Sequence, residues 1–211
     1  MPRAVEVIVA GVGLILLSPI LALCALAIRL EGRGSVFYSQ LRVGRDFQDF
    51  RLLKFRSMNP GAEKKGLLTS PNDARVTRVG RLLRKYKLDE LPQLINVLRG
   101  DMQFVGSRPE VRKYVEHFPN EYALLLLDRP GITDPASILF RHEEEAFSNE
   151  DLEKQYVADI LPRKLELSIG YQRTRSFVSD LKVLIRTVIG LPDVGHEKME
   201  TQGERCAGTR P

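Results

Sequence analysis

Two adjacent carboxylates, Asp89 and Glu90, are the residues of this sequence best placed to do chemistry. Leucine and isoleucine recur every three or four residues from Leu88 to Leu98, so they line one face of a helix. Pro92 fits that helix only in its first turn, where a proline costs no hydrogen bond. The two acids then stand at the helix N-terminus, where free N–H groups favour negative charge and also bind phosphate.

Two acids side by side at a phosphate-binding position repel each other, and a divalent cation would relieve that repulsion most simply. We expect Mg2+, held by Asp89 and Glu90, because hard cations prefer oxygen ligands. Spacing alone leaves a simpler alternative open, in which Asp89 is the N-cap of the helix and Glu90 is a solvated acid in its first turn.

Basic residues precede the acid pair along the chain. Residues 76–86 have apolar side chains at helical spacing, and arginine and lysine occupy the rest of that surface. Such a helix suits a membrane surface, a nucleic acid or a phosphate-binding wall. Guanidinium groups make paired hydrogen bonds to phosphate, so Arg75, Arg78 and Arg84 are the candidates for binding a diphosphate. Some of the basic residues would face lipid headgroups instead.

Two short strands are predicted upstream, over residues 36–42 and 50–56, around a tight turn. Side chains alternate along a strand, so Lys54 and Arg56 project to the same face. This cationic face is either a solvated strand surface or a substrate-binding surface.

The chain begins with an apolar run, residues 4–28, that is long enough to cross a bilayer as a helix. Ser18 and Pro19 lie near its middle, where the proline should bend the helix. Arginines flank the run at positions 3, 29 and 33. Because positive charge prefers the cytoplasmic side of a membrane, both ends of the run are expected on that side. A helix that enters the membrane, bends and returns satisfies these features; a straight single span is the alternative. The run exceeds the apolar region of a usual signal peptide.

Turns and loops follow these elements. Residues 59–72 are rich in Gly, Lys, Pro, Ser and Thr and predict a mobile loop that could cover a site. After the acid pair, residues 105–109 predict a rigid turn that presents Arg108 and Pro109.

The C-terminal third predicts two helices and a tail. One helix should begin at Ser148 and be closed by Leu161-Pro162. A long amphipathic helix should follow over residues 165–188. Residues 191–211 are polar and predict a flexible tail.

Composition restricts the class of partner. The 211 residues suffice for one domain with a real core and are too few for two ordinary ones. With 32 basic and 27 acidic residues and a pI near 9.3, the chain favours an anionic partner. The absence of Trp, and of stacking aromatics in the basic stretch, speaks against nucleic acid. Cys24 and Cys206 suggest neither a disulfide nor a metal site, which fits a cytosol-facing protein.

Six blocks of sequence resemble one family in the same order. They are residues 54–58 (Lys-Phe-Arg-Ser-Met), 73–81 (Asp-Ala-Arg-Val-Thr-Arg-Val-Gly-Arg), 88–94 (Leu-Asp-Glu-Leu-Pro-Gln-Leu), 96–102 (Asn-Val-Leu-Arg-Gly-Asp-Met), 105–110 (Val-Gly-Ser-Arg-Pro-Glu) and 129–133 (Arg-Pro-Gly-Ile-Thr). Over residues 1–135 the chain resembles the bacterial sugar transferase family, the monotopic polyprenyl-phosphate phosphoglycosyl transferases. It departs from the commonest family pattern at Ser107, where proline is usual, and over residues 134–145. The resemblance therefore says least about how this chain would recognise its sugar.

The resemblance implies an α+β, mainly helical protein in three parts. Residues 1–30 would form a re-entrant membrane anchor bent at Ser18-Pro19. Residues 31–190 would form a small cytoplasmic catalytic domain with amphipathic interface helices and a short β-hairpin, and residues 191–211 the flexible tail. The protein would lie on the cytoplasmic face of the bacterial inner membrane, and a homodimer is left open.

The implied reaction transfers a sugar 1-phosphate from a UDP-sugar to polyprenyl phosphate, typically undecaprenyl phosphate, and releases UMP at the start of membrane glycoconjugate and polysaccharide assembly. Asp89 would attack the sugar-bearing phosphate to form a covalent intermediate, and Glu90 would hold Mg2+ or assist proton transfer. The residues expected to bind substrate are Lys54, Arg56, Arg75, Arg78, Arg84, Arg108 and Pro109.

Two alternatives to this reaction stay open. The first is the same transfer in one step, with Asp89 only binding Mg2+ or activating the lipid phosphate. The second is a non-catalytic, membrane-anchored basic module that binds anionic lipid or nucleic acid. The sequence names neither the sugar nor the pathway.

Overall fold

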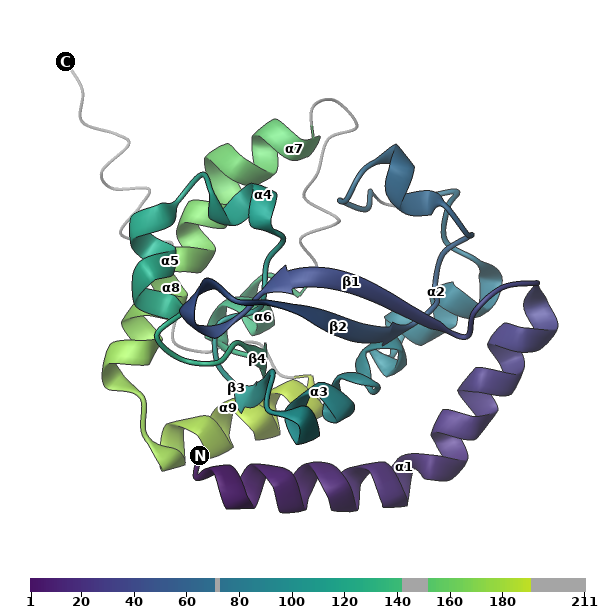
Figure 1. Cartoon of the computed structure of the whole chain (residues 1–211), viewed down its shortest axis with the longest axis horizontal. Helices are drawn as coiled ribbons and strands as arrows, with labels where there is room; N and C mark the ends of the chain where they lie inside the picture. Colours follow the sequence, from purple (N-terminus) through teal and green to yellow (C-terminus); the bar gives the residue numbers. More distant parts are fainter. Residues whose placement is uncertain (71–72, 142–151, 191–211) are drawn as a thin grey trace.

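The computed structural model describes residues 1–70, 73–141 and 152–190 (Figure 1). Its N-terminal apolar run forms one helix, α1 (Arg3–Glu31), which is long and apolar enough to cross a membrane by length and composition. Pro19 lies inside α1, and the helix bends near its middle (Figure 1). A proline removes one intrahelical donor and clashes with the preceding turn, which accounts for a bend at this place.

Both ends of α1 contact the rest of the chain. Near its N-terminus, Nη2 of Arg3 donates to the carbonyl oxygen of Leu98 at 3.1 Å. At its C-terminus, the guanidinium of Arg56 donates to three carbonyl oxygens, those of Ile28, Gly32 and Arg33, at 3.1, 3.1 and 2.8 Å. The last carbonyls of a helix lack intrahelical donors, so Arg56 caps α1.

The predicted hairpin is confirmed. Strand β1 (Phe37–Val43) pairs antiparallel with β2 (Asp49–Phe55), and Phe37 lies opposite Phe55. Strand β2 ends at Phe55, and Arg56 then turns to α1. The cationic face that Lys54 and Arg56 were expected to share therefore does not form.

The basic helix is also confirmed, as α2 (Arg78–Lys85), with Oγ1 of Thr77 accepting the N–H of Gly80 as its N-terminal cap. Its exposed surface carries Leu82 and Tyr86 beside the arginines and lysines. A face that is both apolar and basic is typical of a helix lying at a membrane surface.

The acid pair lies outside the helix that it was expected to begin. Asp89 and Glu90 belong to a separate 3₁₀ turn, η3 (Leu88–Glu90), and α3 (Gln93–Arg99) begins only after Pro92. The expectation that both acids stand at the N-terminus of this helix is therefore wrong, because they precede it in a turn of their own. The alternative that Asp89 is the N-cap is wrong as well, because Pro92 occupies that position.

A second small sheet, which the sequence pattern does not predict, joins distant segments. Strand β3 (Gln103–Val105) pairs in parallel with β4 (Gly131–Thr133). Beside them, Gly106 and Gly131 touch backbone to backbone: a Cβ atom on Gly131 would lie 2.2 Å from the nitrogen of Gly106. No side chain fits there, so the contact needs glycine at this point.

Helices complete the described part of the chain. They are η1 (Arg45–Phe47), η2 (Ala62–Lys65), α4 (Arg112–Val115), α5 (Pro119–Leu125), α6 (Pro135–Leu139), α7 (Leu152–Gln155), the π-helical η5 (Tyr156–Ile160), α8 (Leu161–Thr174) and α9 (Phe177–Ile189). The prediction that Leu161-Pro162 closes a helix is wrong, because η5 continues into α8 with the proline in its first turn. The predicted long helix over residues 165–188 is divided, since Ser176 caps α9 with a capping box.

Two predictions lie outside the described residues: the helix start at Ser148 and the tail over residues 191–211. The fold as described is mostly helical with a small β part, as predicted. Its apolar core has three clusters, one formed mainly by α4, α5, η5 and α8, and two where the halves of α1 pack on the domain. The turn η3 contacts both α2 and β2, and this packing places the acid pair beside the hairpin.

Candidate active site around Asp89 and Glu90

Glu90 lies between two cations. Its Oε1 accepts a hydrogen bond from Nζ of Lys54 at 3.0 Å, and its Oε2 accepts one from Nη1 of Arg108 at 3.2 Å. Nη2 of Arg108 also donates to Oε1. Burial alone would raise the pKa of Glu90, but Arg108 and Lys54 outweigh it and hold that pKa well below its usual range. Glu90 is therefore ionised at neutral pH and fixes both cations.

Asp89 is buried, with 6% of its surface exposed, and its Oδ1 accepts no hydrogen bond from the described residues. Burial raises the pKa of Asp89; the charge of Lys54 opposes the rise, and that of Glu90 adds to it. A buried carboxylate oxygen without a donor keeps its lone pairs for another partner. This oxygen is the atom of the site best suited to attack phosphorus or to bind a cation.

The acid pair fits part of a Mg2+ ligand set. Among the described residues, no three or more His, Cys, Asp or Glu side chains gather into a metal site. Mg2+ is usually held by one or two carboxylates together with substrate phosphates and water, and Oδ1 of Asp89 can serve as one such ligand. Lys54 and Arg108 already relieve the repulsion between the acids, so repulsion no longer argues for a metal.

Of the predicted basic residues, the structure brings Lys54, Arg84 and Arg108 to the acid pair. Arg84 extends from α2, and its Nη2 donates to Oγ1 of Thr69 at 3.0 Å. Its positive charge lowers the pKa of Asp89, against the rise that burial causes. Three positive groups thus surround two carboxylates, as expected for a site that receives further negative charge.

The other predicted residues lie elsewhere. Arg75 organises its own loop, because it binds the carboxylate of Asp73 and three carbonyl oxygens, those of Ala62, Gly66 and Leu68. Arg78 is exposed on α2, and Arg56 caps α1. The carbonyl of Pro109 accepts a hydrogen bond from Arg42 at 3.1 Å. Roles of these residues in binding substrate stay predictions.

Sequence reasoning missed the pair that holds the Arg108 turn. Nη1 of Arg42 lies 3.0 Å from Oε2 of Glu110, and the hydroxyl of Tyr156 donates to Oε1 of Glu110 at 2.6 Å. This network joins β1 and η5 to the residue two positions after Arg108. The signal available in the sequence was Glu110 itself, which directly follows Arg108-Pro109 in the family-like block.

Asn96 positions the other side of the site. Its Oδ1 accepts the backbone N–H of Leu53 at 2.9 Å, and its Nδ2 donates to the carbonyl of Arg51 at 2.7 Å. A fully buried amide that bonds both neighbours of Leu52 fixes β2 against α3. Lys54 follows directly in β2, so Asn96 helps to hold its ammonium at Glu90.

An apolar pocket of about 250 Å³ lies between α1, the β1–β2 hairpin and the start of α3. Its lining is formed by Leu14, Leu21, Ala22, Phe37, Phe55, Pro92 and Ile95. Phe55 adjoins Lys54 in β2, and Pro92 is two residues after Glu90. The pocket therefore places an apolar volume near the charged site.

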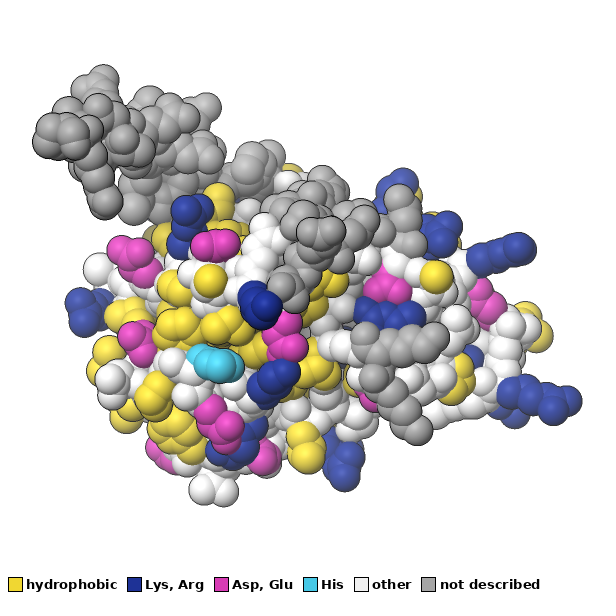
Figure 2. All heavy atoms as spheres, turned by 90° about the horizontal axis from the view of Figure 1, so that it is seen from above, with side chains coloured by type: hydrophobic (Ala, Val, Ile, Leu, Met, Phe, Trp, Pro, Cys, Tyr) yellow, Lys and Arg dark blue, Asp and Glu magenta, His cyan; other side chains and the backbone are white. Residues whose placement is uncertain are grey.

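The surface seen from the side opposite the first half of α1 mixes acidic and basic side chains (Figure 2). Lys and Arg side chains project at the end where α2 and the second half of α1 lie (Figures 1 and 2). This end combines positive charge with the exposed apolar residues of α1 and α2.

Comparison with known proteins identifies the family of the chain. The family described as "Bacterial sugar transferase" matches residues 1–192. The chain is 35% identical over 190 residues to the UDP-N-acetylgalactosamine-undecaprenyl-phosphate N-acetylgalactosaminephosphotransferase of Aeromonas hydrophila, covering 88% of this chain and 42% of that protein. It is 37% identical over 194 residues to the UDP-glucose:undecaprenyl-phosphate glucose-1-phosphate transferase of Caulobacter vibrioides, covering 90% and 68%.

A third relative, the exopolysaccharide production protein ExoY of Rhizobium meliloti, is 37% identical over 171 residues, which cover 74% of this chain and 76% of that protein. This chain thus spans less than half of the Aeromonas protein and about two thirds of the Caulobacter protein. Two of these three relatives are named as enzymes that transfer a sugar phosphate to undecaprenyl phosphate. The chain belongs to the bacterial sugar transferase family.

Proposed function

We propose that this protein transfers a sugar 1-phosphate from a UDP-sugar to polyprenyl phosphate through a covalent intermediate on Asp89. The observation that carries the proposal is Oδ1 of Asp89, a buried oxygen without a hydrogen-bond donor among the described residues, beside Lys54, Arg84 and Arg108. A carboxylate held this way is a free nucleophile in a site that attracts phosphate.

The reaction has two displacements at one phosphorus. First, Oδ1 of Asp89 bonds to the sugar-bearing phosphorus, and the bond from that phosphorus to the UMP oxygen breaks, so UMP leaves with the electron pair. Second, an oxygen of polyprenyl phosphate bonds to the same phosphorus and the Asp89 carboxylate leaves. The acyl phosphate conserves the activation of the donor, so the second step is not strongly uphill. No proton transfer is needed for balance.

The surrounding residues neutralise charge during both steps. Arg108 and Lys54, fixed by Glu90, and Arg84 lie where the diphosphate of the donor would place its charge. Mg2+, bound by Asp89 and Glu90 with substrate phosphates, would supply further neutralisation of phosphate charge. Binding by Glu90 would require one of its two cations to move from its carboxylate.

The anchor suits a lipid acceptor. Both ends of α1 contact the same domain, and the helix bends at Pro19, which supports a re-entrant helix with both ends on the cytoplasmic face. The apolar pocket beside Phe55 and Pro92 offers room for the first hydrocarbon units of the acceptor below its phosphate. The Pro19→Leu change should shift some molecules toward a straight span. A cysteine at position 2 that then reacts with an impermeant reagent from outside reports this shift.

UMP release from a panel of UDP-sugars tests the proposal. Purified protein with polyprenyl phosphate should release UMP from at least one donor and transfer the sugar phosphate to the lipid. No release from any donor would leave the non-catalytic basic module standing. Exchange of labelled UMP into the donor without lipid separates the two-step route from one-step transfer, because only the two-step route forms UMP before lipid arrives.

A further inference from the structure

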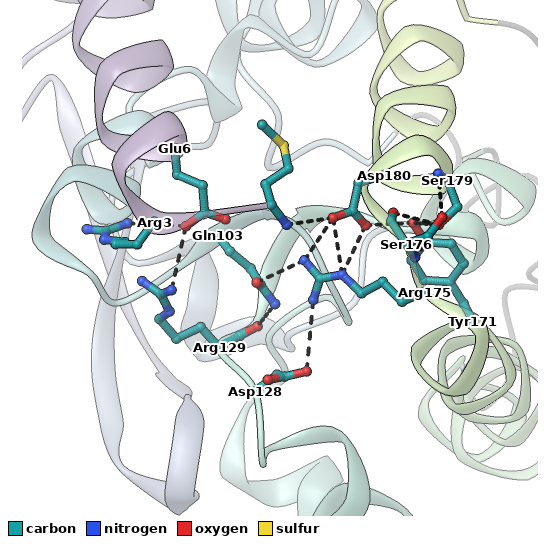
Figure 3. A network of polar contacts seen from close by, with 11 residues as sticks. Arg3, Glu6, Gln103, Asp128, Arg129, Tyr171, Arg175, Ser176, Ser179 and Asp180 are labelled. Carbon is teal, nitrogen blue, oxygen red and sulfur yellow. Dashed lines mark hydrogen bonds and ion pairs between the residues drawn. The ribbon is translucent and has the colours of Figure 1, made fainter.

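Glu6 is the most deeply buried charged group of the anchor. It lies in the first turn of α1, none of its surface is exposed, and neither of its oxygens forms a hydrogen bond with the described residues. Its Oε2 lies 3.5 Å from Nη1 of Arg3 and 3.6 Å from Nη2 of Arg129 (Figure 3). A buried carboxylate is costly unless cations compensate its charge. Glu6 is therefore tolerated only while Arg129 and Arg3 stay beside it.

Arg129 belongs to the segment that leads into β4. Its carbonyl oxygen accepts a hydrogen bond from Nε2 of Gln103, and the carbonyl of Pro130 accepts the backbone N–H of Gln103 at 2.9 Å. Oε1 of Gln103 in turn accepts a hydrogen bond from Arg175 at 3.1 Å (Figure 3). The N-terminal end of the anchor thus docks on a segment that is itself held on two sides.

Strand β4 connects this docking point to the acid pair. The backbone N–H of Gly131 donates to the carbonyl of Ser107 at 2.9 Å, and Nη1 of Arg108 donates to the carbonyl of Ile132 at 3.5 Å. Arg108 also donates to Glu90, so it links β4 to the acid pair. The backbones of Gly106 and Gly131 are in direct contact, so the two segments cannot move independently. A shift of β4 therefore displaces the Arg108 turn.

We propose that Glu6 and Arg129 are positioning residues that dock the N-terminal end of the anchor on the domain and, through β4, hold Arg108 against Glu90. The catalytic part of the inference rests on the proposed function. The docking of the anchor through Glu6 and Arg129 is independent of the proposed function. The consequence is that the enzyme reaches full rate only when the N-terminal end of its anchor is docked on the domain.

The test compares Glu6→Gln, Arg129→Gln, the double variant and the charge exchange Glu6→Lys with Arg129→Glu, in full-length protein in membranes. Glu6→Gln should lower kcat for UMP release roughly 10- to 100-fold, the usual effect of losing a supporting contact, with an unchanged KM for UDP-sugar. The double variant should lose no more than the worse single variant. The charge exchange should recover part of the rate, because the ion pair with position 129 is restored while Arg3 repels the new lysine. Glu116→Gln, an exposed acid after α4, is the control and should keep the wild-type rate.

Labelling gives a readout independent of activity. With Cys24 and Cys206 replaced, a cysteine at position 2 should react faster with a soluble thiol reagent in Glu6→Gln than in the parent, and the charge exchange should slow it again. Wild-type kcat in Glu6→Gln, multiplicative losses in the double variant, or unchanged labelling would overturn the inference. If the parent protein turns over no donor, the proposed function fails, while labelling still decides whether Glu6 and Arg129 dock the anchor.

Discussion

Lys54 and Arg56 are two residues apart, and the structure gives them different tasks. Lys54 lies 3.0 Å from Glu90, whereas Arg56 donates to three carbonyls at the end of α1. Replacing each by Met removes the charge and keeps an apolar stem of similar length. Lys54→Met should lower kcat by roughly 10² to 10³, the usual cost of losing one group that stabilises transition-state charge. Arg56→Met should change kcat only a few-fold, by the same reasoning, since it contacts no part of the site.

The free energy of unfolding should fall more in Arg56→Met than in Lys54→Met. The side chains of Lys54 and Glu90 are 22% and 14% exposed, and Glu90 keeps Arg108 after the change. The loss should therefore fall between that of an exposed and a buried pair, about 1 kcal/mol. Arg56 makes three hydrogen bonds, two of them exposed, each contributing about 0.5–1.5 kcal/mol, so Arg56→Met should cost about 1–3 kcal/mol.

The assay measures UMP release per folded molecule at saturating substrates and the Tm of the same samples. We expect Lys54→Met to be slow with a small fall in Tm, and Arg56→Met to be near normal in rate with the larger fall. A slow Arg56→Met with unchanged Tm, beside a fully active Lys54→Met, would refute the assignment of these two residues.

Four further predictions concern the metal, the pKa of Asp89 and the packing of Gly131. Turnover should collapse in chelator and return with Mg2+, because two carboxylates meet a diphosphate here; full rate after exhaustive chelation would contradict this. Burial raises the pKa of Asp89, so the acidic limb of the pH–rate profile should lie above the usual aspartate value of about 3.9. Because its folded pKa is the higher one, ionised Asp89 destabilises the fold near neutral pH and Asp89→Asn should raise Tm; a lower Tm would count against this. Gly131→Ala should lower unfolding free energy by about 1–3 kcal/mol, since its Cβ would meet Gly106; urea titration measures this.

The sequence predicted those features that leave a periodic or compositional signal. The apolar run became α1, alternation gave the hairpin, and Leu-Asp-Glu-Leu-Pro located the acid pair. The strands β3 (Gln103–Val105) and β4 (Gly131–Thr133) have three residues each, too few for any period, and their pairing depends on Gly106 meeting Gly131. A sheet of that kind is visible only in three dimensions.

The errors have local physical causes. Arg56 leaves the alternation of β2 because the end of α1 offers it three carbonyls, and Arg75 turns inward because Asp73 lies two residues away. Pro162 did not end its helix because η5 precedes it, where the N–H of Leu161 already bonds five residues back to Tyr156. Hydrogen bonding is irregular at this point, which makes a residue without an N–H tolerable.

The covalent step on Asp89 is tested most directly by mass spectrometry of the protein after incubation with a UDP-sugar and Mg2+ in the absence of lipid. We expect a mass increase equal to one sugar phosphate on the peptide that contains Asp89. The added mass should be lost when polyprenyl phosphate is added and should be missing in Asp89→Asn. A wild-type protein that turns over donor and lipid together, yet carries no sugar phosphate on any residue before lipid is added, would contradict the covalent route.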